Sequence, residues 1–420
     1  MRRKLLCLCL ILFTLLTAAP FHSSPTTTVS AHTHLHSNNA ALTQTSATPL
    51  PVSTRRGQPL WPGSRFTEEA RERAILRGLN FIYRTALKPR NFRDYGPDYI
   101  WCFYTLSEAF RDEKASSTAR RMGLERAHFW RRTHRFVPAD ADAGLISELA
   151  YGDDAATSLG LRDDHLRAQL KRAAPRFKAR DYLLFDPRTE PPPSDVPDEC
   201  EYCGADDNPR GSKVCHVCKH ALVMRTRYDV WYDALITTYV GDRSGIILGA
   251  HYVDVLKWLP TLRPYHASRN DPDDAEFYDT VYAIAHIVYT LNNYSQYKLS
   301  PNLLPQEFEY LKANLSEAIR EKEDDMLGEF MDTLRAFGLT TNDPLIRQGM
   351  EYYLAHQNSD GSWGDRHEKD IYQRYHPTWN AIAGLSEYTW KSEGLSFPEV
   401  KPLLEQWNRS VSSSRRSVAK

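Results

Sequence analysis

Residues 275–293 read AEFYDTVYAIAHIVYTLNN and carry two opposite stripes. Five apolar side chains recur at steps of four and three residues: Phe277, Val281, Ile284, Val288 and Leu291. Five polar or aromatic ones recur at the same steps between them: Asp279, Tyr282, His286, Tyr289 and Asn293. This period predicts a helix with one face in a core. Because the second stripe has no Lys or Arg, we expect it to line a wet cavity, and a solvent-exposed face is the alternative.

The helical period continues through the rest of the folded chain. Candidate helices span residues 67–86, 97–112, 117–134, 141–150, 163–175, 226–240, 246–258, 275–293, 305–320, 323–337, 343–357 and 377–391. About a dozen helices in succession predict about six antiparallel pairs, arranged as a ring or a solenoid. The fold class we expect is all-α, an (α/α)6-type toroid of helical hairpins over residues 61–395.

Four cysteines interrupt this pattern as two Cys-x-x-Cys pairs. Cys200 and Cys203 are separated by eleven residues from Cys215 and Cys218. Two such knuckles place four thiolates around one tetrahedral Zn²⁺ ion and leave no position for a substrate. Because the segment 176–225 is too short to bury a core of its own, we expect an insertion folded by a structural zinc ion. Two disulfides are the alternative.

The first residues of the chain are typical of an export signal. Three basic residues at positions 2–4 precede an apolar stretch, residues 5–19. Its length suits a signal sequence and is short for a membrane-spanning helix. We expect a signal peptide within residues 1–31, cleaved after Ala19 or Ala31, and a secreted, periplasmic or lumenal protein. An uncleaved anchor is the alternative, and no other run is apolar enough to span a bilayer.

Composition narrows the choice of partners. Lys plus Arg and Asp plus Glu both number 53 among 420 residues, so no net charge favours nucleic acid. Residues 32–60 are polar and lack periodicity, which predicts a disordered leader, and residues 396–420 form a C-terminal tail. Sequons at Asn293, Asn314 and Asn408 predict a glycoprotein in a host that glycosylates.

Residues 349–364 read GMEYYLAHQNSDGSWG. This stretch resembles the QW repeat of the α/α-toroid enzymes that include squalene–hopene and other class II terpene cyclases. The resemblance implies that a helix ends at Gln357, which binds backbone at the next helix start. It also implies that Trp363 stacks on Gln357 and that Gly361 supplies the turn. The following segment looks like that family's inner helix, with Pro377 in its first turn.

The same resemblance points to a catalytic acid. The string Asp-Pro-Asp-Asp at residues 271–274 matches the family motif Asp-x-Asp-Asp, whose middle Asp protonates an alkene or epoxide. The resemblance therefore implies that Asp273 is the proton donor of a terpene-type cyclase.

Two carboxylates on one helix are a further candidate for acid–base chemistry. Asp229 and Asp233 stand four residues apart, so both lie on one helix face. One of such a pair can act as a general acid while the other stays ionised. A cation site and a solvated face are the alternatives. Glu329 is a further candidate for a cavity wall.

Three histidines on different helices complete the candidate site. His251 lies three residues before Asp254, which is placed to orient its imidazole. His376 begins the helix after the QW-like loop. In a toroid His251, His286 and His376 would converge, and three histidines with a carboxylate would bind a second metal. A structural role for each histidine is the alternative.

Three classes of function agree with these patterns. The first is an enzyme that processes a glycan as a hydrolase, lyase or epimerase, because Asp, Glu, Tyr and His are the groups such reactions need. The second is a terpene-type cyclase or isomerase, whose aromatic walls would guide a carbocation. The third is a non-catalytic binding scaffold. We expect an enzyme acting on a small molecule or an oligosaccharide.

Overall fold

The computed structural model describes residues 58–266 and 275–418, and most of them are helical. The expected all-α class is confirmed at this level. Several helices begin at a side chain that accepts a hydrogen bond from the backbone of the first turn. Such caps are Thr67, Asp112, Asp142, Asp163 and Thr226. They satisfy N–H groups that have no partner inside the helix.

The elements follow one another along the chain. The longer helices before residue 270 are α1 (Glu68–Ala86), α2 (Pro89–Ala109), α3 (Glu113–Thr133), α4 (Ala143–Ser158), α5 (Asp164–Ala173) and α7 (Arg227–Ser244). The short ones are α6 (Ala179–Leu183), α8 (Tyr252–Leu256) and α9 (Leu259–Leu262). Then come α10 (Ala275–Leu291), α11 (Pro305–Glu321), α12 (Asp324–Ala336), α13 (Pro344–His356), α14 (Tyr372–Leu385) and α15 (Lys401–Val418).

Two pairs of short strands accompany the helices. Strand β1 (Val196–Pro197) pairs antiparallel with β2 (Met224–Arg225), and the two form the base of the cysteine-containing segment. Strand β3 (Tyr297–Lys298) pairs in parallel with β4 (Ser392–Glu393), so a segment after α10 lies beside a segment after α14.

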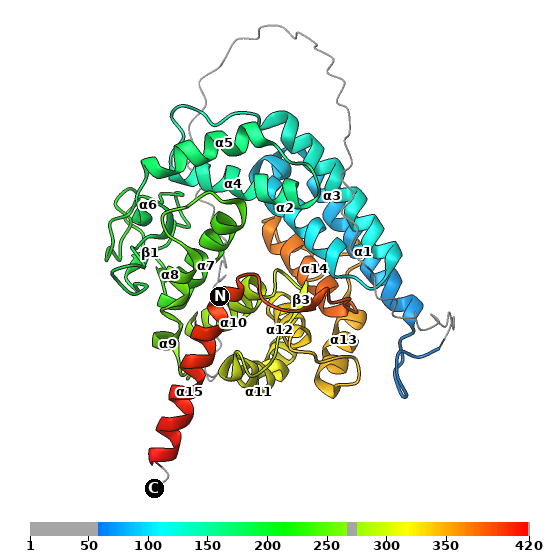
Figure 1. Ribbon diagram of the computed structural model, residues 1–420. Helices are drawn as coiled ribbons and strands as arrows, with labels where there is room; N and C mark the ends of the chain where they lie inside the picture. The colour runs from blue at the N-terminus through cyan, green and yellow to red at the C-terminus, as the bar shows by residue number, and fades with distance from the viewer. Residues whose placement is uncertain (1–57, 267–274, 419–420) are drawn as a thin grey trace, which may run out of the picture.

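Six helices that are separated by others in the sequence contact one another in the order in which they occur along the chain. Contacts join α2 to α4, α4 to α7, α7 to α10, α10 to α12 and α12 to α14, and α14 also contacts α2. The intervening helices pack on this set: α1 and α3 on α2, α5 on α4, α11 on α12, and α13 on α14. Figure 1 shows the two sets following each other around a common centre. The polar faces of six helices from distant parts of the chain thereby come together.

The first helix is tied to the loop that follows α13. Nε2 of Gln357 donates hydrogen bonds to the carbonyl of Ala74 in α1, at 2.8 Å, and to the carbonyl of Gly361, at 3.0 Å. From the other side, Arg77 of α1 donates to the carbonyls of residues 358 and 359. Gln357 therefore binds the middle of α1. The resemblance to the QW repeat implied instead that it binds backbone at the start of the next helix.

Gly361→Ala should destabilise the fold by about 2–4 kcal/mol. Gly361 has φ +96°, and an added Cβ would lie 2.5 Å from the carbonyl oxygen of Arg77. Gly364→Ala is the matched control, because its φ of +85° is similar but the nearest atoms are 3.7 Å away. It should cost about 1–2 kcal/mol. Urea unfolding measures both changes, and equal losses would contradict the close approach to α1.

Some predicted elements differ from the observed ones. The helix expected at residues 246–258 is reduced to α8, because Gly249 takes φ +82° and interrupts the chain before it. Helix α14 begins at Tyr372, so Pro377 lies inside it and not in its first turn. The tail from residue 396 includes α15, whose Leu404 is buried.

Several predictions lie outside the described residues. These are the signal peptide within residues 1–31, the leader up to residue 57, and Asp273. None of the helices in the described ranges is long and apolar enough to cross a membrane.

Candidate functional site

A cavity of about 400 Å³ lies among α2, α4, α7, α10, α12 and α14. This volume is in the range of small-molecule sites. Its aromatic lining consists of Tyr95, Trp101, Tyr151, Tyr289, Tyr294, Tyr372, Trp379 and Tyr388. Its acidic lining consists of Asp94, Asp98, Glu148, Glu199, Asp233, Glu329 and Asp332. The predicted residues His286 and His376 also line it. Flat rings beside carboxyl groups can hold a polar ring-shaped molecule.

Asp325 of α12 organises one wall of this cavity. Its Oδ1 lies 2.8 Å from Nδ1 of His376 and accepts a hydrogen bond from Asn380 at 2.8 Å. Its Oδ2 accepts a hydrogen bond from the Tyr282 hydroxyl at 3.0 Å. Burial opposes the charge of His376, but the ion pair with Asp325 outweighs it and raises the pKa of His376 to about 9. The wall therefore holds an imidazolium–carboxylate pair at neutral pH.

Glu329 lies one helical turn beyond Asp325 and lines the cavity. Burial, followed by the negative charge of Asp325, raises the pKa of Glu329 well above its usual range. Its Oε1 is 3.5 Å from Nδ2 of Asn380, and its Oε2 has no hydrogen-bond partner in the described structure. The surroundings of Glu329 therefore favour its neutral form, and one of its oxygens is unused. A proton donor requires this form.

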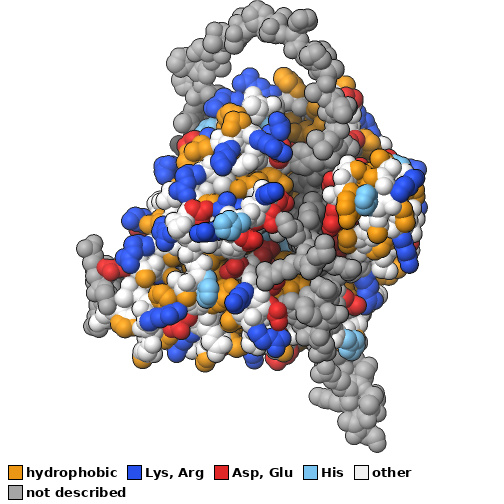
Figure 2. All heavy atoms as spheres, turned by 180° about the vertical axis from the view of Figure 1, so that it is seen from behind, with side chains coloured by type: hydrophobic (Ala, Val, Ile, Leu, Met, Phe, Trp, Pro, Cys, Tyr) orange, Lys and Arg blue, Asp and Glu red, His pale blue; other side chains and the backbone are white. Residues whose placement is uncertain are grey.

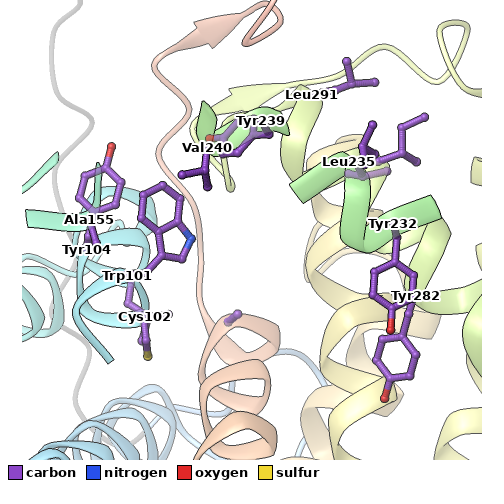
Figure 3. Close-up of a cluster of buried hydrophobic side chains, with 14 of the residues drawn as sticks. Trp101, Cys102, Tyr104, Ala155, Tyr232, Leu235, Tyr239, Val240, Tyr282 and Leu291 are labelled. Atoms are coloured by element: carbon purple, nitrogen blue, oxygen red, sulfur yellow. The ribbon is translucent and has the colours of Figure 1, made fainter. Parts of the chain in front are cut away.

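His286 is the neutral histidine of the site. Its Nδ1 lies 2.7 Å from the carbonyl oxygen of Tyr282, and its ring stacks on Tyr232 with centroids 4.9 Å apart. A carbonyl only accepts hydrogen bonds, so Nδ1 carries the proton and Nε2 has a free lone pair. Burial lowers the pKa of His286 to about 4. The ring of Tyr289 meets the imidazole edge to face, with centroids 5.7 Å apart. Figure 3 shows Tyr232 of α7 beside Tyr282 of α10.

Asp98 of α2 provides a carboxyl group on another wall. The hydroxyl of Tyr375 donates to its Oδ2 at 2.6 Å, and that of Tyr151 donates to its Oδ1 at 3.2 Å. Burial raises the pKa of Asp98. Two phenols from α4 and α14 therefore fix its orientation.

The indole nitrogen of Trp101 is a further polar atom of the lining that is buried without a partner in the described ranges. The side chain is only 1% exposed. A buried donor without an acceptor costs about 1–3 kcal/mol. Together with Oε2 of Glu329, this atom indicates a cavity built to bind a polar molecule.

The Asp229–Asp233 pair is arranged differently from the prediction. Arg225 lies between the two carboxylates, bonded to Asp229 at 2.7 and 3.0 Å and also to Asp233. Only Asp233 lines the cavity, and burial raises its pKa to about 8. Because a guanidinium is bonded to both carboxyl groups, they do not form the isolated acid pair that we expected.

Only His286 and Tyr289 of the predicted α10 stripe line the cavity, and Asp279, Tyr282 and Asn293 do not. Asp279 accepts a hydrogen bond from Thr226 at 2.8 Å, and burial raises its pKa to about 7. Asn293 follows the end of the helix, accepts from the Tyr239 hydroxyl at 2.8 Å and donates from Nδ2 to Gln296 at 2.8 Å. A glycan at this sequon would be attached to the same Nδ2 atom.

His251 lies apart from the cavity. Its side chain is 59% exposed and precedes α8, with Nδ1 2.9 Å from Oδ1 of Asp242. Asp254 binds the backbone N–H of His251, at 3.1 Å, and not its imidazole. The three predicted histidines therefore do not converge, and the second metal site based on them is not supported by the described residues.

The four cysteines form one cluster. Their Sγ atoms all lie within 4.8 Å of one another, with Cys200 and Cys218 3.3 Å apart and Cys203 and Cys215 3.6 Å apart. Zn–S bonds of 2.3 Å in a tetrahedron give S–S distances of about 3.8 Å, whereas a disulfide requires about 2.05 Å. None of the described cysteines forms a disulfide. The cluster can bind a metal ion such as zinc.

Backbone geometry shapes both knuckles. The N–H of Gly204 donates to the carbonyl of Cys200 at 2.8 Å, and the N–H of Lys219 donates to that of Cys215 at 3.0 Å. Both donors have positive φ, 71° and 64°. The cluster packs only with Leu222 and Ala205 in a small core of its own, so four thiolates without a metal would have little apolar support.

Sequence reasoning missed Asp98, Asp325 and Asp332. The α12 pair stands in a stripe with Glu329, at steps of four and three residues, opposite the apolar side chains of the same helix. The criterion applied to residues 275–293 would have found it. Asp98 is a single acid before an aromatic run, and its role depends on tyrosines from two distant helices.

Comparisons with known proteins return no relatives. No family model, no curated protein and no solved structure matches the chain.

Proposed function

We propose that the helices close into an (α/α)6 toroid and that the chain is a glycan hydrolase acting in its central cavity. Contacts of α14 with α2, and of α1 with α13 and α14, support the closure. One observation carries the reaction: Glu329 is a buried carboxyl group with an unpartnered oxygen in a cavity walled by aromatic rings, and burial raises its pKa. Cleavage of a glycosidic bond needs such a proton donor.

Three groups take part in the proposed hydrolysis. Glu329 donates its proton to the glycosidic oxygen as the bond from that oxygen to the anomeric carbon breaks. A water molecule attacks the anomeric carbon, and Nε2 of His286 accepts a proton from that water. With a pKa of about 4, His286 is as basic as an ordinary carboxylate, the usual base of glycosidases. The proton then returns from His286 through solvent to Glu329.

The ion pair of Asp325 and His376 on the same wall affects the protonation of Glu329. Asp325 keeps its negative charge because His376 and Asn380 bind it, and this charge adds to the effect of burial in raising the pKa of Glu329. The aromatic rings provide apolar faces on which sugar rings can stack. Export of the chain, which the first residues predict, would give it access to extracellular glycans.

The terpene-type cyclase is the weaker candidate. A carbocation in this cavity would meet the free lone pair of His286, which would remove a proton and end cyclisation early. The acid assigned by resemblance, Asp273, lies outside the described residues. An isoprenoid substrate therefore belongs in the same assay as an alternative to glycans.

Glu329→Gln should reduce hydrolysis by about 10²–10⁴-fold while leaving the fold intact. The amide keeps the shape of the carboxylic acid but has no acidic proton. The measurement is release of reducing ends from a panel of oligosaccharides with different linkages. Glu307→Gln is the control, because Glu307 is also buried but pairs with Arg263 away from the cavity. It should lower stability and leave turnover per folded molecule unchanged. Full activity of Glu329→Gln would reject the proposal.

We also propose that the metal of the cysteine cluster is zinc and that its role is structural. Four sulfur ligands leave no open position for a substrate. The cluster is joined to the cavity through the chain, since Glu199 precedes Cys200 and lines the cavity.

A further inference from the structure

The surface of α1 and α3 carries a large excess of positive charge. Among residues 68–135, twelve Lys and Arg side chains are exposed but only two acidic ones, Glu113 and Glu125. The whole chain has equal numbers of basic and acidic residues, so its charge is unevenly distributed. The two helices contact each other and both pack on α2. Figure 1 shows them side by side, and Figure 2, seen from behind, shows many Lys and Arg side chains at the upper left, where they lie.

The outward side of α1 carries a row of cations. Arg73, Arg77 and Arg84 stand at steps of four and seven residues, which keeps them on one side of the helix, and Lys88 follows its end. Arg77 and Arg84 donate hydrogen bonds to backbone carbonyls of residues 358–360. A carbonyl has no net charge, so these bonds leave the positive charge uncompensated. The acidic residues of α1, at positions 68, 69 and 72, are half-buried near its start.

Helix α3 carries a second row beside the first. Lys114, Arg121 and Arg132 stand at steps of seven and eleven residues, again on one side of the helix, and Arg135 follows its end. Glu125 lies between them, but it is already bonded to the Tyr83 hydroxyl and to Arg126. The eight cations of the two rows are all exposed. We call them together the basic face.

The length of the rows indicates an extended partner. Eleven residues separate Arg73 from Arg84 and eighteen separate Lys114 from Arg132, which gives rows of about 17 and 27 Å along the two helices. Guanidinium groups bind planar or tetrahedral oxyanions through paired hydrogen bonds. A single small anion would meet one or two of these side chains, whereas a polymer with repeated anionic groups would meet most of them.

We propose that the basic face binds a linear polysaccharide that carries carboxylate or sulfate groups. The inference goes beyond the proposed hydrolysis, because none of the eight cations lines the cavity. The first residues of the chain predict export, which would bring this face to anionic polysaccharides outside the cell. Binding there would hold the protein on such a polymer while the cavity stays open to its own substrate.

The side chains between the cations favour a polymer over a lipid bilayer. Asn80 in α1 and Ser117 and His128 in α3 lie in the same outward rows and are exposed. A helix that binds the surface of a bilayer needs an apolar stripe beside its cations. Between residues 68 and 135, Leu87 and Phe129 are the only large apolar side chains that are exposed. The two rows are therefore polar along their length.

The test uses two pairs of polysaccharides in which only the charge differs. Carboxymethylcellulose is compared with hydroxyethylcellulose, and dextran sulfate with dextran. Biolayer interferometry measures binding of the full chain at low and at high salt. We expect at least one charged polymer to bind about 10-fold tighter than its uncharged partner at low salt, and high salt to remove the difference by screening. The pair with the larger difference identifies the anionic group.

Charge-removing variants locate the binding surface. The combined variant Arg73→Gln, Arg121→Gln, Arg132→Gln and Arg135→Gln should weaken binding of the charged polymer about 10-fold and leave the fold intact, because all four side chains are exposed. The matched control makes the same change in net charge at four exposed lysines outside α1 and α3: Lys312→Gln, Lys322→Gln, Lys369→Gln and Lys401→Gln. It should bind as the unmodified protein does.

Three results would overturn the proposal. The first is equal binding of the charged and uncharged members of both pairs. The second is an equal loss of affinity in the two combined variants, which would show that net charge acts without a defined surface. The third is tighter binding of duplex DNA, or of phosphatidylglycerol vesicles, than of either charged polysaccharide at the same salt concentration.

Discussion

Asp325→Asn should abolish turnover and destabilise the protein by about 3–5 kcal/mol. The carboxylate of Asp325 is bonded to His376, Asn380 and Tyr282. Its loss leaves the imidazolium of His376 buried without a counter-ion, which is the costly way to break a buried ion pair. It also removes the negative charge that, after burial, raises the pKa of Glu329. The variant should therefore lose a structural ion pair and hold the proton of the proposed donor less firmly.

The ion pair between His376 and Asp325 predicts how the free energy of unfolding depends on pH. His376 has a pKa of about 9 in the folded protein, above its value of about 6.5 in an unfolded chain. Its contribution is therefore fully present below about pH 6.5 and is lost as the pH rises through 9. The pKa of Asp325 is lowered, despite burial, by His376, so that contribution is lost as the pH falls below about 4. In Asp325→Asn the loss of stability between pH 7 and 9 should be smaller.

A double-mutant cycle separates the pair from its surroundings. Urea unfolding of Asp325→Asn, His376→Asn and the double variant gives their interaction energy. We expect the double variant to be more stable than the sum of the two single losses predicts, because it leaves no unpaired charge. Additive losses, or a wild-type pH profile in Asp325→Asn, would show that the two groups act independently.

Removal of the metal from the cysteine cluster should unfold the segment between β1 and β2 and inactivate the protein. Structural zinc contributes about 10–16 kcal/mol of binding free energy in small modules, and this module has few apolar contacts of its own. Two groups connect it to the cavity: Glu199 lines the wall, and Arg225 of β2 holds Asp233 in place. The main helical body should keep most of its helix content.

Metal analysis and proteolysis test this expectation. Purified protein should contain one zinc ion per chain, and a chelator should release it, make residues 198–223 sensitive to protease and lower activity. Cys215→Ser should have the same effect, whereas Cys102→Ala is the control, because Cys102 is buried far from the cluster in α2. Detection of two disulfides by mass spectrometry, or full activity without metal, would contradict the structural role.

The amphipathic period of the helices explains which parts of the site were predictable. The stripe that contains His286 was found because a buried helix repeats its apolar positions every three to four residues. The helix was expected at residues 275–293 and ends at Leu291. The same rule applied to α12 would have added Asp325. The local sequence pattern therefore assigns a residue to a helix face, but it does not identify the residues of other helices that this face contacts.

Contacts between distant helices explain what was not predictable. Asp98 acquires its role from Tyr375, 277 residues later, and a single sequence carries no record of that pairing. His251 looked like a cavity residue because a helix was expected around it, but the left-handed turn at Gly249 rotates the chain before α8. The partner of Asp233 was missed because Arg225 lies on a strand outside the helix.

The junction between α1 and the loop after α13 has a consequence for biosynthesis. The hydrogen bond from Arg77 joins residues 281 positions apart, and that from Gln357 spans 283. Helix α1 must therefore wait until the loop after α13 has been synthesised before it can bury this surface, and contacts of such long range slow folding. Until residues 357–359 have been added, this side of α1 in the nascent chain stays accessible to chaperones.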